Sequence, residues 1–157
     1  MKYFFTPLAA VMLFSACDFG TTGKGNIITE KRELASFNSI TTNAVAEITL
    51  VQDSTTSVEV KGYENLVPLL LTSVSDGVLT IETKKHLTLI GKTHLEVIIH
   101  LPSVKQLNLS GVGSINSQGN FNFHDLKVEI SGVGSISLSG EANKITLENS
   151  GTGSINC

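Results

Sequence analysis

A hexapeptide that returns three times near the C-terminus constrains the fold more than any other feature. Its copies begin at residues 110, 131 and 150, so the period is 21 residues and then 19. A period of about 20 residues is typical of repeat proteins in which each unit buries its apolar side against the next. The copies are Ser110-Gly111-Val112-Gly113-Ser114-Ile115, Ser131-Gly132-Val133-Gly134-Ser135-Ile136 and Ser150-Gly151-Thr152-Gly153-Ser154-Ile155.

A short alternating run precedes each copy and predicts a strand. In Leu107-Asn108-Leu109 and Val128-Glu129-Ile130, apolar side chains occupy every second position, as in a half-buried strand. The Gly-x-Gly that follows permits a positive φ or a close approach of two backbones. Strand, glycine corner, strand and loop then form one coil of a β-solenoid. The predicted corner glycines are Gly111, Gly113, Gly132, Gly134, Gly151 and Gly153.

Stacked coils would align equivalent residues in columns. The inward columns would be Leu107, Val128 and Leu147 on one side and Ile115, Ile136 and Ile155 on the other. On the outer face Glu129 and Glu148 would follow Asn108 at a spacing of about 4.8 Å, with Lys127 beside them. We interpret this row as a partly compensated, solvated ladder. Calcium or glycan binding is the alternative, because calcium sites and glycosidases both use paired carboxylates.

Nucleotide binding does not fit the glycine pairs. A dinucleotide fingerprint needs a third glycine and a following helix, and a P-loop needs Gly-Lys-Ser/Thr. Neither occurs here, since Ser-Ile in strand-like sequence follows each pair.

The region before the repeats is also rich in strand patterns, but no 20-residue repeat is evident between 27 and 101. Asp76-Gly77 predicts a type I′ hairpin. Glu64 to Leu71, with Pro68 near its start, predicts one or two helical turns. Lys84 to Lys92 predicts a loop holding a short strand at Leu87–Ile90. The other predicted strands are 27–32, 37–42, 45–51, 57–61, 70–75, 78–83 and 94–101.

The N-terminus predicts export and lipidation. An apolar run of about 12 residues follows Lys2, which is the length of a signal-peptide core and too short to span a bilayer. Leu13-Phe14-Ser15-Ala16-Cys17 resembles a lipobox, apart from Phe14 where Leu or Val is usual. We therefore expect a signal peptide over 1–16, lipidation of Cys17, a flexible tether over 17–26, and one β-solenoid domain over 27–157 with repeats from about 104. With Cys17 lipidated, only Cys157 remains, so no intrachain disulfide is expected.

Charge and histidine spacing narrow the chemistry. The chain carries 11 basic and 14 acidic side chains, which argues against a nucleic-acid partner. None of the histidines shows the spacing of a zinc site or belongs to a recognisable nucleophile motif. We expect no catalytic residues, no metal and no cofactor. The histidines are His86, His94, His100 and His124.

The repeats, taken with three upstream segments in the same order, resemble the autotransporter-adhesin head GIN domain family of bacterial surface proteins. Those segments are Phe37-Asn38-Ser39-Ile40, Tyr63-Glu64-Asn65-Leu66-Val67-Pro68 and Gly77-Val78-Leu79-Thr80-Ile81-Glu82-Thr83. The resemblance covers residues 26–157. It implies an all-β, right-handed β-helix-like fold, no identified catalytic residues and an adhesion role. Members of that family usually continue through several more repeats, whereas this chain stops at Asn156-Cys157.

Three functions stay open at this point. The first is a non-enzymatic, lipid-anchored envelope protein, at the outer membrane or periplasmic face, whose repeats bind a glycan or protein. The second is a carbohydrate-active enzyme on a β-helix, and the third a structural lipoprotein without a specific ligand. Asn149 replaces the apolar residue of its column in the last coil, and a bare terminal coil needs a cap. We therefore expect that either the chain is cut short relative to that family, or another copy of the chain completes this edge as a homo-oligomer.

Overall fold

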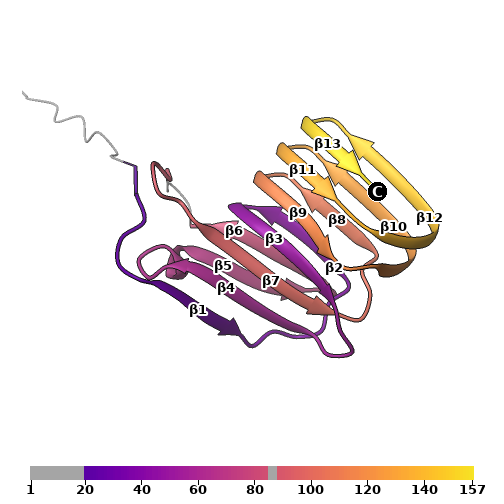
Figure 1. Ribbon diagram of the computed structural model, residues 1–157, viewed down its shortest axis with the longest axis horizontal. Helices are drawn as coiled ribbons and strands as arrows, with labels where there is room; N and C mark the ends of the chain where they lie inside the picture. The colour runs from indigo at the N-terminus through magenta and orange to yellow at the C-terminus, as the bar shows by residue number, and fades with distance from the viewer. Residues whose placement is uncertain (1–19, 85–87) are drawn as a thin grey trace, which may run out of the picture.

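The structure is a computed structural model that describes residues 20–84 and 88–157. These residues form strands in two mixed sheets and one short 3-10 helix, so the all-β prediction is confirmed (Figure 1). The seven-stranded sheet has the order β1-β4-β7-β3-β9-β11-β13, and the six-stranded sheet has the order β12-β10-β8-β2-β6-β5. The elements are β1 Ile27–Arg32, β2 Ser39–Asn43, β3 Val45–Gln52, β4 Ser57–Tyr63, η1 Val67–Leu69, β5 Leu70–Ser75, β6 Val78–Thr83, β7 Leu95–Leu101, β8 Gln106–Leu109, β9 Val112–Gln118, β10 Phe121–Ile130, β11 Val133–Ser137, β12 Gly140–Asn149 and β13 Thr152–Asn156.

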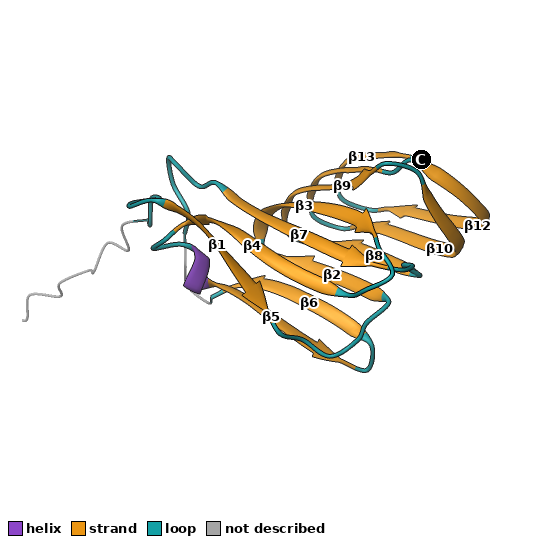
Figure 2. Cartoon of the chain, turned by 60° about the horizontal axis from the view of Figure 1, so that its bottom comes forward, coloured by secondary structure: helices purple, strands orange, loops and turns teal. Residues whose placement is uncertain are grey.

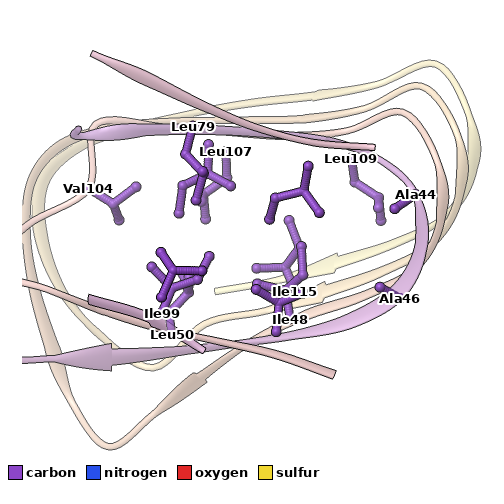
Figure 3. Packing of buried hydrophobic residues seen from close by; sticks show 14 of the residues in the cluster. Ala44, Ala46, Ile48, Leu50, Leu79, Ile99, Val104, Leu107, Leu109 and Ile115 are labelled. Atoms are coloured by element: carbon purple, nitrogen blue, oxygen red, sulfur yellow. The ribbon is translucent and has the colours of Figure 1, made fainter. Parts of the chain in front are cut away.

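The two sheets face each other across one apolar core (Figure 3). Leu79 and Leu107 project from the six-stranded sheet toward Ile99 and Ile115 of the seven-stranded sheet, and all four are fully buried. The alternation along each strand explains this arrangement, because side chains at every second position leave the same face of a strand.

The three hexapeptides stack in parallel and in register, as predicted. Ile136 of β11 pairs with Ile115 of β9 on one side and with Ile155 of β13 on the other. In the six-stranded sheet, Val128 of β10 lies between Leu107 of β8 and Leu147 of β12. Both predicted columns are therefore confirmed as register partners. Figure 1 shows β9, β11 and β13, which carry one of the columns, side by side.

A further layer of the stack precedes the three hexapeptides, but its corner lies 113 − 46 = 67 residues before the first of theirs and so outside the 20-residue period. β2 pairs in parallel with β8, and β3 with β9, so Ile48 aligns with Ile115. The corner between β2 and β3 reads Ala44-Val45-Ala46, and Ala46 is the register partner of Gly113. Alanine in place of glycine hid this unit from a search for glycine pairs.

The stacking itself explains why later corners need glycine. A Cβ built on Gly132 would overlap the carbonyl oxygen of Gly111 in the corner beneath and lie 2.6 Å from the carbonyl carbon of Ser110. The corner at Ala44 has no tight corner beneath it, because β6 ends at Thr83 and β7 begins only at Leu95. A space of about 200 Å³ lies beside Ala46, lined in part by Thr93, His94 and Leu95. Glycine is thus required where one corner rests on another.

The first part of the domain is antiparallel at its edges. β5 and β6 form the predicted hairpin, with positive φ at Asp76 (51°) and Gly77 (74°). The helical segment predicted over 64–71 shrinks to η1, with Pro68 in its first turn. Figure 2 shows η1 at the end of the domain away from the repeats. No helix among the residues that the structure describes is long and apolar enough to cross a membrane.

The predicted tether is described from Gly20 onward, and there it is hydrogen-bonded to the domain. The backbone N–H of Thr21 donates to the carbonyl oxygen of Thr88 at 2.6 Å, and that of Gly23 donates to Lys92 at 2.6 Å. Leu89 forms an isolated bridge with Thr21, where a short strand was predicted. The predicted signal peptide and the predicted lipidation site at Cys17 lie outside the described residues.

Candidate ligand-binding face

In the six-stranded sheet, the repeat strands β8, β10 and β12 run parallel, and their outward side chains form a polar row. Asn108 of β8, Glu129 of β10 and Glu148 of β12 are consecutive register partners. We call these three residues the polar ladder. The side chains of Asn108 and Glu129 point away from the core because the residues on either side of each, such as Val128 and Ile130, point into it. Glu148 is the register partner of Glu129 and lies on the same outer face.

Lys127 forms ion pairs with both carboxylates of the ladder. Its Nζ lies 3.0 Å from Glu129 Oε1 and 3.4 Å from Glu148 Oε2. Gln106 Nε2 also donates to Glu129 Oε2 at 3.0 Å. The hydrogen bond from Lys127, helped by that from Gln106, holds the pKa of Glu129 below its usual value. The hydrogen bond to Glu129 in turn raises the pKa of Lys127. Glu129 is therefore ionised and ion-paired at neutral pH.

A shallow groove of about 320 Å³ runs along the ladder at the corner side. A second row, of serine hydroxyls, borders it: Ser131 Oγ donates to Ser110 Oγ at 3.1 Å. Ser110 Oγ donates in turn to Asn108 Oδ1 at 2.7 Å. Amide, carboxylate and hydroxyl groups thus recur at the repeat spacing on one exposed surface. The groove is lined by Asn108, Glu129, Ile130, Ser131, Glu148, Asn149 and Ser150.

A second polar hollow, of about 360 Å³, lies at the other end of β10 and β12. Gln52 enters it from β3, where its Oε1 accepts a hydrogen bond from the backbone N–H of Asn122 at 3.1 Å. Sequence reasoning missed this site because Gln52 and Asn122 are 70 residues apart and neither belongs to a motif. The lining residues are Gln52, Asn120, Phe121, Asn122, Gly140 and Glu141.

Glu129 is poorly suited to the general-acid role in glycoside hydrolysis. A general acid needs a carboxyl whose pKa is raised, so that it holds a proton at neutral pH. The pKa of Glu129 is shifted in the opposite direction by Lys127. In the part of the chain that the structure describes, no group of three or more His, Cys, Asp or Glu side chains could hold a metal ion.

The structure does not bring the histidines together with these groups. His100 Nδ1 lies 3.5 Å from Asp53 Oδ2 at the far end of β7, and both side chains are partly exposed. His94 and His124 are exposed, and His86 lies outside the described residues. Cys157 is an exposed free thiol.

All six predicted corner glycines lie at the stacked bends, where a Cβ would overlap the backbone of the preceding corner. Asn149 also belongs to the last bend, where its amide spans the corner. Its Nδ2 donates to the carbonyl oxygen of Gly153 at 3.0 Å, and its Oδ1 accepts from Gly151 N at 3.2 Å. These two bonds explain the polar residue in a column that is otherwise apolar.

A family model described as "Putative auto-transporter adhesin, head GIN domain" matches residues 36–157. A comparison with curated proteins finds none that matches. The fold resembles several solved structures, with identities low enough that the likeness concerns the fold alone. A "Putative lipid binding protein" of Parabacteroides distasonis is 24% identical, with a TM-score of 0.74 over 87% of this chain and 60% of that one. The chain thus spans 60% of that protein's length.

Two structures described as putative adhesins show the same fold. One, from Parabacteroides distasonis, is 23% identical with a TM-score of 0.64, over 88% of this chain and 68% of that one. The other, from Parabacteroides merdae, is 18% identical with a TM-score of 0.52, over 87% of this chain and 82% of that one.

Proposed function

Because the chain belongs to the putative auto-transporter adhesin, head GIN domain family, we propose that it is an exported, non-enzymatic binding module of the cell envelope. Its ligand is a glycan with repeated hydroxyl groups, and it binds along the polar ladder. The observation that carries this proposal is the in-register row of Asn108, Glu129 and Glu148 beside a groove of about 320 Å³. A row of acceptors and donors at one fixed spacing suits a ligand whose own groups repeat.

The rigidity of the scaffold supports this role. Asn108 and Glu129 alternate with fully or nearly fully buried neighbours, such as Leu107 and Val128, so strands β8 and β10 cannot rotate without opening the core. A preorganised polar surface loses less conformational entropy when a ligand binds than a flexible one does. We propose that the stacked repeats form a right-handed β-solenoid with coils of about 20 residues, as in other repeat architectures.

The N-terminus supports attachment to a membrane through lipid. The segment that ends in Ala16-Cys17 resembles a lipobox. Two or more acyl chains anchor a protein stably, whereas a single chain does not. We propose that Cys17 carries the lipid and that the domain remains near the membrane surface, because residues 21–24 are hydrogen-bonded to the domain rather than free. Incorporation of labelled palmitate that is lost in Cys17→Ser and kept in Cys157→Ser would agree with this.

The ligand proposal is tested with a glycan array on the chain from Asp18 onward, followed by titration calorimetry of the best binder. Glu148→Gln removes one ladder carboxylate and should weaken binding by about tenfold, the loss of one charged hydrogen bond. Glu47→Gln is the matched control, since Glu47 is an exposed carboxylate on β3 in the other sheet. Equal affinities of the two variants, or an array without any binder, would contradict the proposal.

A further inference from the structure

The outer strand of the six-stranded sheet, β12, exposes side chains at core positions. Ile145 and Leu147 are the register partners of Leu126 and Val128 in β10. The β10 residues are buried, with 2% and 0% of their surface exposed, whereas Ile145 is 43% exposed and Leu147 50%. Among the described strands, β12 pairs in its sheet with β10 alone. An edge strand with apolar side chains is a template for pairing with another strand.

We propose that β12 pairs with β12 of a second copy, antiparallel, about a two-fold axis at Thr146. Such an axis places residues equally distant from Thr146 opposite each other. Ile145 of one copy then faces Leu147 of the other on the core side. On the outer side, Lys144 of one copy faces Glu148 of the other. The two-fold symmetry makes each of these contacts occur twice. The strand is thus complementary to itself in both shape and charge.

No nearby register matches as well. Opposite residues must point to the same side of the sheet, so the axis passes through a residue and not between two residues. An axis at Ile145 would set Leu147 against Asn143, and one at Leu147 would set Ile145 against Asn149. Both alternatives place an apolar side chain against an amide and leave Lys144 without its acidic partner.

The surroundings of β12 also fit this arrangement. Asn149 is already engaged by two hydrogen bonds to its own corner, which makes the corner end of the strand polar. The two-fold axis is perpendicular to the sheets, so it also brings the β13 edges of the two copies toward each other. The half-buried Ile155 of β13 is then covered by the second copy. At the opposite edge of the seven-stranded sheet, β1 carries Glu30, Lys31 and Arg32. Charges of this kind protect an edge from pairing and disfavour an open, head-to-tail array.

A charge exchange between two variants tests the proposal, by sedimentation equilibrium of the chain from Asp18 onward. The wild type should form a dimer. Lys144→Glu sets two acidic side chains against each other at both contacts, and Glu148→Lys sets two basic ones, so each variant alone should dissociate about tenfold more readily or worse. An equimolar mixture of the two variants restores opposite charges at both contacts and should dimerise with an affinity close to that of the wild type.

Two further variants separate the contact from general effects. Lys84→Glu makes the same change of charge on the exposed loop after β6 and should leave the dimer intact. Leu147→Asp alters a side chain that is half exposed in one copy, so it should fold and remain a monomer. A wild type that stays monomeric at about 100 µM, or a mixture that does not recover, overturns the proposal. Glu148 belongs to the polar ladder as well as to the dimer contact. Lys144→Glu and Leu147→Asp leave the ladder residues unchanged, so their effect on dimerisation tests the dimer whatever the glycan array shows.

Discussion

Replacing Gly132 by alanine measures the requirement for glycine at a stacked corner. Gly132 has no positive φ that would by itself demand glycine, so the change tests space alone. The added Cβ would overlap the carbonyl oxygen of Gly111, which is fixed because it accepts a hydrogen bond from Val133 N at 3.0 Å. Gly132 N donates to the carbonyl oxygen of Leu109 at 3.0 Å. The corner between β10 and β11 must therefore move away from the corner between β8 and β9 before the methyl group fits.

The expected cost follows from these contacts. Two weakened backbone hydrogen bonds contribute about 1 kcal/mol each. Overpacking of a dense region adds about 1–3 kcal/mol. We therefore expect Gly132→Ala to lower the free energy of unfolding by about 3–5 kcal/mol, measured by urea denaturation followed with circular dichroism.

Gly119→Ala is the matched control. Gly119 has a φ of 78°, but a Cβ there would meet nothing within 4 Å. Its cost should be the left-handed backbone term alone, about 1–2 kcal/mol. If Gly132→Ala destabilises the protein no more than Gly119→Ala does, the corners do not rest on each other as described and the steric reasoning fails.

Three further predictions concern the columns and the ladder. Ile136→Ala should lower the free energy of unfolding, measured by urea denaturation, by about 2–5 kcal/mol because Ile136 is fully buried. Ile155→Ala should lower it clearly less because Ile155 is only half-buried, and equal losses would refute the stacking. Asn149→Ala removes both hydrogen bonds that span the last corner, so amide exchange of β13 should become faster while that of β9 is unchanged. The hydrogen bond from Lys127 lowers the pKa of Glu129 from its ordinary value of about 4.5, so the folded state gains stability above that pH and loses it as the pH falls through the lowered folded pKa. An NMR titration in which Lys127→Met leaves the pKa of Glu129 unchanged would contradict this account.

Regular patterns made much of this fold predictable. The strands 27–32, 70–75 and 78–83 have the predicted bounds, and Asp76-Gly77 forms the predicted hairpin. The row from Asn108 to Glu148 was also predicted, because a repeat fixes which residues become neighbours without any knowledge of the rest of the chain.

What the sequence did not reveal depends on what lies next to a residue in space. Ala44 and Ala46 occupy a repeat corner, but the absence of a corner beneath them removed the need for glycine and so the visible signal. The hollow beside Gln52 and Asn122 joins segments 70 residues apart, so no local pattern could indicate it. The pairing of Thr21 with Leu89 was hidden for the same reason.

Contacts between isoleucine methyl groups test the stacking of the repeats most directly. Adjacent strands lie about 4.8 Å apart and alternate ones about twice that distance. In a spectrum of through-space methyl contacts, we expect strong signals from Ile136 to both Ile115 and Ile155, and a much weaker one between Ile115 and Ile155. A missing contact between Ile115 and Ile136 would contradict the in-register stack.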